Sequence, residues 1–261
     1  MITRNNENTI IQKIKTMNIF KLSFAGLLLA SIAFTSCGKE SNCKSGSGGI
    51  ETKTLNIAAF TSIDFQEAGE VIISEGPVQE VVVTGHSNAV NDIQSTVNNG
   101  LWEIDFDSRC YKNYDLTVYI TMPKIEGAYL SGSGSITLND FVTPQNDLSL
   151  IISGSGNIFL SAFEGSEQLF VNISGSGDIT TSADIPTLKS LDINISGSGN
   201  YKGYSTITDA CTASISGSGN CEVYVQDSLD VSISGSGSVF YKGNPTVNAN
   251  ISGSGTVVNA N

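Results

Sequence analysis

Basic residues are scarce in this sequence, and their scarcity argues against several classes of partner and catalyst. The 261 residues include 13 Lys and Arg against 25 Asp and Glu, a formal net charge of −12. A surface of this charge repels nucleic acid and anionic lipid, so we predict no nucleic-acid partner. A polysaccharide lyase is also disfavoured, because it needs several cationic groups to neutralise a uronate, and residues 37–261 hold one Arg and a few scattered Lys.

Residues suited to metal binding and nucleophilic catalysis are equally few. His86, the one histidine, stands in "TGHSN" without an adjacent acid or nucleophile, so we interpret it as a turn or surface residue rather than a general base. The five cysteines show no CxxC or Cys/His spacing, so we predict no metal site, and we expect no cofactor. The serines of the recurring "SGSG" are not nucleophiles either, because no helix follows them.

Helical periodicity is missing from residue 54 onward, and strand-like alternation takes its place. In "LTVYITM", Leu116, Val118 and Ile120 fall on one face while the intervening residues fall on the other. We therefore predict an all-β fold for residues 54–261, with residues 54–124 as irregular first strands and residues 125–261 as repeated coils.

The N-terminus has the pattern expected of an export signal. Lys21 precedes an apolar run from Leu22 to Phe34, which is too short to span a bilayer as a stable helix, and small residues lead to Cys37. "FTSC" resembles the lipobox of bacterial lipoproteins, which implies cleavage before Cys37 and acylation of that residue; an ordinary secretory signal is the alternative. We predict a signal peptide over residues 1–36 and a flexible, lipid-proximal tether over residues 37–53, which are rich in Gly and Ser.

The tetrapeptide "SGSG" repeats seven times in the second half of the chain. The copies begin at Ser131, Ser153, Ser174, Ser196, Ser216, Ser234 and Ser252, at spacings of 22, 21, 22, 20, 18 and 18 residues. Such a period suits one coil of a solenoid, in which each coil buries its apolar face only by stacking on its neighbours.

The apolar positions around each "SGSG" share one phase. In the second repeat, Leu148, Leu150 and Ile152 precede the tetrapeptide and Ile158 follows it, all at even offsets, and the other repeats follow the same pattern. Because side chains alternate faces along a strand, we predict that Gly154 and Gly156 point inward at a corner with no room for a side chain. The serines then point outward in a column that we call the serine ladder: Ser131, Ser133, Ser153, Ser155, Ser174, Ser176, Ser196, Ser198, Ser216, Ser218, Ser234, Ser236, Ser252 and Ser254.

The repeats and the strands before them resemble one known family. "FTSIDFQEAGEVIISEG" (60–76), "EVVVTGHSN" (80–88), "STVNNGLWEIDF" (95–106), "LTVYITMPKIEGAYLSGSGSI" (116–136) and the "SGSG" array are similar to the auto-transporter adhesin head GIN domain family of exported Bacteroidetes-type lipoproteins. The resemblance covers about residues 55–257. It implies a right-handed parallel β-helix and a cell-envelope location, and it supplies no catalytic residues. From the resemblance together with Cys37, we predict a protein that is lipid-anchored at the outer membrane, on either the periplasmic or the surface-exposed side.

Four cysteines remain after the lipidation site: Cys43, Cys110, Cys211 and Cys221. Four cysteines allow three pairings, and the sequence does not choose among them. Cys211 and Cys221 fall in inward columns of one coil, so they either form a disulfide across the interior or remain two buried thiols.

Two functional hypotheses follow from these residues. The first is a non-catalytic adhesin or scaffold that binds a glycan or surface protein through the serine ladder. The alternative for the ladder itself is that small polar side chains simply stack well on the outside of a solenoid. The second is a glycan hydrolase, which needs two carboxylates facing each other across a groove; the repeats offer scattered acidic residues that we interpret as solvated, and Trp102 is interpreted as core. The last strand edge predicts either a homo-oligomer through the solenoid end or a cap folded back from residues 54–124.

Overall fold

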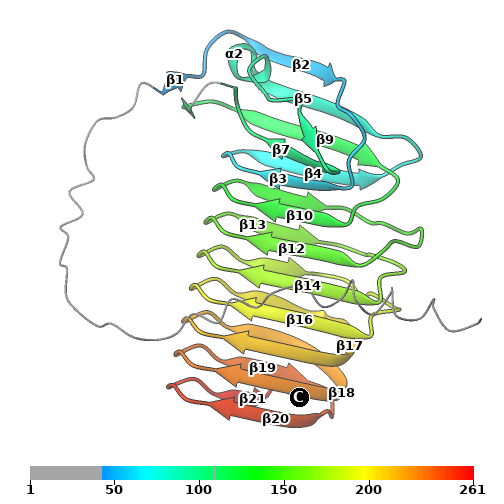
Figure 1. The fold of residues 1–261 in the computed structure, drawn as a ribbon, viewed down its shortest axis with the longest axis vertical. Helices are drawn as coiled ribbons and strands as arrows, with labels where there is room; N and C mark the ends of the chain where they lie inside the picture. Colours follow the sequence, from blue (N-terminus) through cyan, green and yellow to red (C-terminus); the bar gives the residue numbers. More distant parts are fainter. Residues whose placement is uncertain (1–42, 108–109) are drawn as a thin grey trace, which may run out of the picture. The chain divides into compact units, whose positions relative to one another are not determined.

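The computed structural model describes residues 43–107 and 110–261, and the predicted signal peptide and Cys37 lie outside these ranges. Strands stack as successive coils of a parallel solenoid (Figure 1), in which two walls face each other. The predicted parallel β-helix is thereby confirmed.

The first wall is built from parallel strands that pair from one coil to the next. Along the stack it contains β7 (Leu101–Ile104), β3 (Ser62–Phe65), β10 (Gly127–Leu130), β12 (Leu148–Ile152), β14 (Gln168–Ile173), β16 (Ser190–Ile195), the later parts of β17 (Tyr201–Ile215) and β18 (Cys221–Ile233), and β20 (Thr246–Ile251).

The second wall faces the first, and each of its strands comes after a corner in its coil. It contains β9 (Leu116–Met122), β4 (Glu70–Glu75), β11 (Ser135–Leu138), β13 (Asn157–Leu160), β15 (Ile179–Thr181), the early parts of β17 and β18, β19 (Val239–Lys242) and β21 (Val257–Asn259).

The register reproduces the spacing expected from the repeats. Ile152 pairs with Ile173, Ile195 with Ile215, and Ile233 with Ile251, so every "SGSG" lies directly over the one before it. The inward columns of Leu, Ile and Val fill the space between the walls and are almost fully buried in every coil before the last. Stacking thus supplies a core that no single coil could bury.

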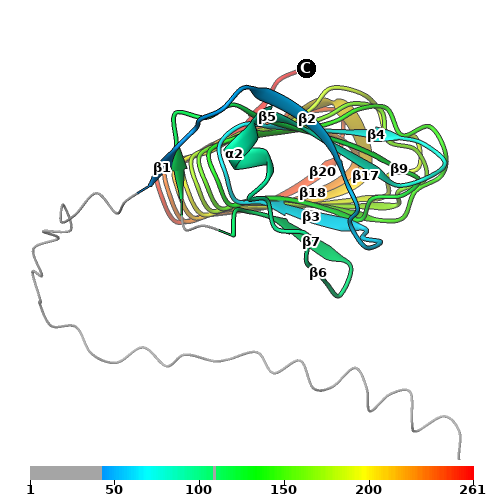
Figure 2. The same ribbon diagram turned by 90° about the horizontal axis from the view of Figure 1, so that it is seen from above.

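Antiparallel strands close the N-terminal end of the stack. β2 (Ile50–Leu55) pairs with β5 (Glu80–His86), which in turn pairs with β9, and the short helix α2 (Ser87–Val90) lies beside them (Figures 1 and 2). A short strand β6 (Val97–Asn98) pairs with β7. Apolar side chains of β5 and β9 face the interior, so this layer covers the first coil.

The fold begins earlier than the sequence predicted. Residues 43–53 were expected in a flexible tether, yet β1 (Lys44–Ser45) pairs with β8 (Tyr111–Lys112) and β2 starts at Ile50. The "SGSG" at 45–48 is also held, because the backbone N–H of Ser47 donates to Asn88 Oδ1 at 2.8 Å. Alternation in a six-residue strand that follows a Gly/Ser run was too weak a signal to move the boundary.

Candidate functional site

Each "SGSG" forms the corner that joins the first wall to the second. The glycines are required because the preceding coil passes very close: a Cβ on Gly177 would overlap the carbonyl oxygen of Gly156, and a Cβ on Gly199 would overlap that of Gly177. The prediction that these glycines point into the core needs a correction. The atoms that an added Cβ would meet belong mainly to the backbone of the preceding coil, along the stack, rather than to the core. Close backbone approach is one of the established reasons for a glycine in a strand.

The corner backbone is fixed by hydrogen bonds between coils. The N–H of Ser196 donates to the carbonyl of Ile173 at 2.9 Å, and the N–H of Ser198 donates to that of Gly175 at 3.0 Å. The same pair of bonds recurs at the corners from Ser153 to Ser254. These tetrapeptides therefore continue the β ladder and do not behave as linkers.

All fourteen side chains of the serine ladder are exposed. Ser131 Oγ donates to Asp64 Oδ1 at 2.9 Å, and within residues 43–107 and 110–261 no other ladder hydroxyl has a side-chain partner. Successive coils repeat at about 4.8 Å, so the ladder offers a regular column of hydroxyl groups, and all of them except that of Ser131 are open to a ligand.

A second polar column fixes the corner on its far side. Asn157 Oδ1 accepts from the N–H of Asp178 at 3.0 Å, Asp178 Oδ1 accepts from the N–H of Asn200 at 2.9 Å, and Asn200 Oδ1 accepts from that of Asn220 at 2.9 Å. Asn220 Oδ1 then accepts from the N–H of Ser238 at 3.0 Å. Each side chain thus satisfies a donor in the next coil.

Asp178 is the charged member of this column. Lys202 Nζ lies 2.6 Å from its Oδ2, and the side-chain amide of Asn200 donates to its Oδ1 at 2.8 Å. Partial burial raises the pKa of Asp178, but the hydrogen bonds from Lys202 and Asn200 outweigh burial, so the pKa lies below its usual value. The carboxylate is therefore occupied in holding the column.

A groove of about 180 Å³ runs beside the ladder near the far end of the stack. Its polar lining consists of ladder serines and of side chains one alternation earlier on the first wall: Asn194, Ser196, Ser214, Ser216, Ser232 and Ser234. Every polar group in the lining is a hydroxyl or an amide, so the groove is suited to a neutral, hydrogen-bonding ligand.

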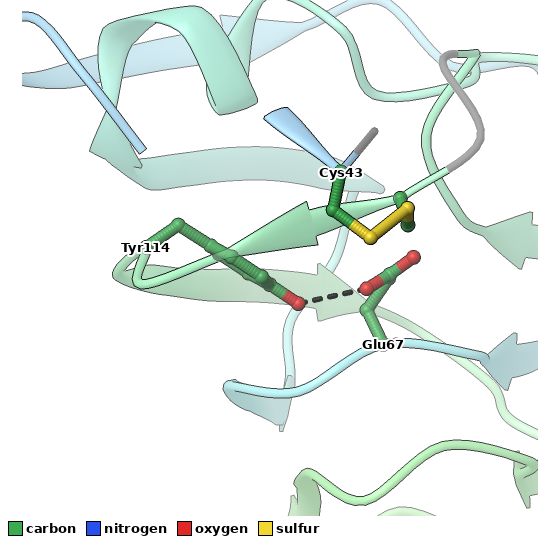
Figure 3. Close-up of a disulfide and its surroundings, with 4 residues drawn as sticks. Cys43, Glu67 and Tyr114 are labelled. Atoms are coloured by element: carbon green, nitrogen blue, oxygen red, sulfur yellow. Dashed lines mark hydrogen bonds between the residues drawn. A yellow bond between two sulfur atoms is a disulfide. The ribbon is translucent and has the colours of Figure 1, made fainter. Parts of the chain in front are cut away.

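Glu67 occupies the N-terminal end of the glycine column. Pairing of Phe65 with Leu130 and of Glu70 with Ser135 places Glu67 opposite Gly132, the first glycine of the array. This corner has no "SGSG" corner before it, so a side chain fits. The carboxylate accepts a hydrogen bond from the Tyr114 hydroxyl at 2.7 Å (Figure 3).

The pKa of Glu67 is raised to about 7, chiefly by burial and in addition by a hydrogen bond and charge repulsion from Asp105, while the hydrogen bond from the Tyr114 hydroxyl lowers it in part. The pKa of Tyr114 is raised as well, by burial and by the neighbouring carboxylate. A cavity of about 410 Å³ adjoins the pair and extends past Lys112 to Ser133 of the ladder.

Glu67 and Asp105 do not have the geometry of a glycosidase. Hydrolases hold their two carboxyl groups about 5 Å or more apart so that the sugar or a water fits between them. Here Asp105 raises the pKa of Glu67 through a hydrogen bond and charge repulsion, which indicates that the two carboxyl groups lie closer together than that separation. Sequence reasoning missed this pair because the two residues lie 38 positions apart in irregular segments with no motif.

The cysteines form a different arrangement from the one considered for the repeats. Cys43 is bonded to Cys110, which fastens the segment before β1 to the segment before β8 (Figure 3). Cys211 and Cys221 are both buried and free, so the disulfide considered between them is absent from the structure and the two are buried thiols. Burial raises the pKa of both thiols, which disfavours thiolate chemistry.

The remaining candidates have structural roles. His86 Nδ1 accepts the N–H of Asp115 at 2.9 Å, and Trp102 is fully buried with its Nε1 donating to the carbonyl of Gln94 at 3.0 Å. Within the described ranges, no three His, Cys, Asp or Glu side chains gather closely enough to hold a metal ion. The same residues include no helix with the length and apolar character needed to cross a bilayer.

Solved structures of several bacterial proteins share this fold. The chain is similar to a "putative adhesin" from Bacteroides fragilis (TM-score 0.74, 23% identity, 82% of this chain and 99% of that one). It is also similar to a "putative adhesin" from Parabacteroides merdae (TM-score 0.65, 18% identity, 85% and 100%). A third, a "putative lipid binding protein" from Parabacteroides distasonis, has a TM-score of 0.65 at 22% identity over 82% and 99%.

No curated protein sequence matches the chain. The sequence profile of the family described as "Putative auto-transporter adhesin, head GIN domain" matches residues 59–245, which is well over half of the chain and spans the early strands as well as most of the corners. The chain therefore belongs to the auto-transporter adhesin head GIN domain family.

Proposed function

We propose that this protein is a non-catalytic lipoprotein of the cell envelope, held at the outer membrane through Cys37, whose solenoid binds a glycan or a surface protein along the serine ladder. The observation that carries the proposal is the column of exposed hydroxyls on a backbone fixed by bonds between coils. Rigid presentation favours binding, because little conformational entropy is lost when a ligand engages.

Repetition supports a polymeric or extended ligand. Each coil adds the same two hydroxyls at about 4.8 Å intervals, so one weak contact is multiplied along the ladder without any new type of interaction. The groove lined by Ser196, Ser216 and Ser234 is a hollow in this surface that such a ligand could enter. Its neutral lining favours uncharged hydroxyl and amide groups, as on a neutral or N-acetylated sugar.

The binding test uses the chain from residue 38. Residues 42–261 form one compact unit, so this chain retains the whole fold. We expect it to bind members of a glycan array or a panel of matrix proteins, and the triple variant Ser196→Ala, Ser216→Ala and Ser234→Ala to bind at least tenfold more weakly. The control triple changes exposed serines elsewhere, Ser47, Ser95 and Ser205.

Three outcomes would contradict the binding proposal. Absence of any ligand on both arrays would favour a purely structural role. Equal loss in both triple variants would mean that the ladder is not the site. Release of reducing sugar from a bound glycan would support the glycan hydrolase, the alternative that the close spacing of the Glu67 and Asp105 carboxyl groups disfavours.

The disulfide supports a short attachment. Cys43 follows Cys37 by six residues, and six extended residues reach at most about 20 Å. Because Cys43 lies at the capped end, this arrangement would keep that end near the membrane and direct the last coils away from it. Mass analysis of the mature N-terminus tests the anchor: we expect an acylated Cys37, and loss of acylation in Cys37→Ser. An unmodified N-terminus at another residue would refute it.

A further inference from the structure

The last coil of the solenoid has an uncovered face. This coil consists of β20 and β21, which we call the tip (Figure 1). β20 pairs with β18 and β21 with β19, and neither has a strand on its other side in the described part of the chain. The tip therefore presents unpaired backbone donors and acceptors along its edge.

Apolar side chains are also left open at the tip. Val247 and Ile251 belong to the inward columns and are 37% and 40% exposed, whereas Leu229 and Ile233, in the same columns one coil earlier, are 0% and 1% exposed. The difference arises because, among the residues that the structure describes, no coil lies beyond β20 and β21 to cover them. A further layer of strand would bury both the edge and these side chains.

The two ends of the stack differ in how their edges are protected. At the capped end, β2 is an antiparallel strand that carries Glu51 and Lys53, and charges on an edge oppose further pairing. Residues 243–261 contain no charged side chain in a protein of net charge −12. The tip is thus a place where two copies can meet without placing the carboxylate side chains of their last coils against each other.

We propose that two copies of this chain pair tip to tip, with β20 of one copy antiparallel to β20 of the other. A two-fold axis makes the contact self-complementary, so the assembly closes at two copies. A head-to-tail filament is disfavoured, because the capped end offers a charged antiparallel edge instead of a matching parallel one. Asn248 and Asn250 of one copy then lie next to the same residues of the other, where amides pair readily.

Tip-to-tip pairing fixes where the N-terminal ends of the two folded solenoids lie. Both solenoids extend away from the shared tip, so the Cys43–Cys110 disulfides lie at opposite ends of the assembly. If the lipid anchor of the proposed function is correct, the two anchors belong to two different membranes. The tip is then a device for contact between facing envelopes, while pairing in solution does not depend on the anchor.

The pairing test compares two double variants of the chain from residue 38. Asn248→Lys with Asn250→Lys places four ammonium groups across the joint. Thr212→Lys with Ser214→Lys is the matched control, because Thr212 and Ser214 occupy the same two columns two coils earlier, where no partner is expected. Sedimentation velocity over a wide concentration range reads the size of the assembly.

We expect wild type and control to form a reversible dimer, with a dissociation constant on the order of tens of micromolar for so narrow a joint, and the Asn248/Asn250 variant to dimerise at least tenfold more weakly. A wild-type monomer at several hundred micromolar, open-ended polymers, or a dimer that the edge lysines leave unchanged would overturn the proposal.

A second measurement tests the opposed arrangement without relying on Cys37. The chain is attached to nickel-chelating vesicles through a histidine tag placed before residue 38. We expect turbidity from vesicle clustering with wild type and the Thr212/Ser214 control, and none with the Asn248/Asn250 variant. A solution dimer that fails to cluster vesicles would refute the tip-to-tip geometry. An unacylated Cys37 would refute the anchor alone and leave both results standing.

Discussion

The Tyr114 hydroxyl donates a 2.7 Å hydrogen bond to Glu67, and Glu67 stands where every later corner has a glycine. The pair therefore lies at the N-terminal end of the column of corner glycines. In the rest of that column each coil lies too close to the preceding coil for a side chain. The carboxyl group of Glu67 is the only described acid in the chain whose pKa is raised to about 7, by burial first and by Asp105 in addition.

The raised pKa of Glu67 predicts a pH-dependent stability. The folded pKa lies above the unfolded value of about 4.5, so the folded state holds its proton more tightly and the free energy of unfolding falls as pH rises from about 4.5 to about 7. Because Gln does not titrate, we expect the free energy of unfolding of Glu67→Gln to fall by about 1 kcal/mol less than that of wild type over this pH range. This value is reduced for solvent screening. Urea titrations at pH 5 and pH 8 measure it.

Tyr114→Phe provides the companion to that measurement. Its hydroxyl lowers the pKa of Glu67, so its removal is expected to shift the stability loss to higher pH. Identical pH profiles for wild type and both variants would mean that the carboxyl group is not held as described.

Corner glycines are predicted to be intolerant of alanine. Gly177→Ala or Gly199→Ala would push a methyl group onto a carbonyl oxygen of the coil before, which we expect to cost about 3 kcal/mol of unfolding free energy. Gly49→Ala is the matched control, because nothing lies within 4 Å of a Cβ built there. Thermal melts distinguish them, and equal melting temperatures for Gly177→Ala and Gly49→Ala would contradict the packing argument.

Asp178 is predicted to be replaceable by asparagine and not by alanine. Asn keeps the acceptor for the N–H of Asn200 and loses the exposed ion pair with Lys202, a change of less than about 1 kcal/mol. Ala leaves that N–H without its acceptor, for a cost of about 1 to 2 kcal/mol.

The sign of the pH effect at Asp178 is opposite to that at Glu67. The folded pKa of Asp178 is lowered, so its stabilisation is present above the unfolded pKa and is lost as pH falls through the folded value, in the range below about pH 4. Acid titration followed by circular dichroism should find Asp178→Asn less sensitive than wild type. A wild-type protein with no greater acid sensitivity than the variant would refute the lowered pKa.

The Cys43–Cys110 bond is predicted to stabilise the capped end. Its cysteines are 67 residues apart, and replacing both by serine should cost roughly 3 kcal/mol. A reducing agent should lower the melting temperature of wild type by as much as the double serine replacement does. In Cys211→Ala with Cys221→Ala it should act as it does in wild type, because those thiols are free. A non-reduced peptide joining residues 211 and 221 would contradict the structure.

Sequence reasoning reached the solenoid because its evidence was periodic. Columns such as Ile152, Ile173 and Ile195 keep one phase over six repeats, and register follows directly from that phase. It could not choose among cysteine pairings, since the distance from Cys43 to Cys110 depends on how the irregular loop before β8 returns to the cap. Glu67 escaped notice for a related reason: its significance lies in its neighbours Tyr114 and Asp105, which only the folded cap brings to it.

The shortening of the coils toward β20 has a consequence for how the molecule opens. Coils of 22 residues near the cap give way to coils of 18, so less chain and less apolar surface stabilise each successive layer. Amide protons of the final layers should therefore exchange with deuterium soonest, and fraying should advance toward the cap one layer at a time. A second copy that covers the last layer would slow that exchange. Pairing of two copies would then also slow the unfolding of the whole solenoid.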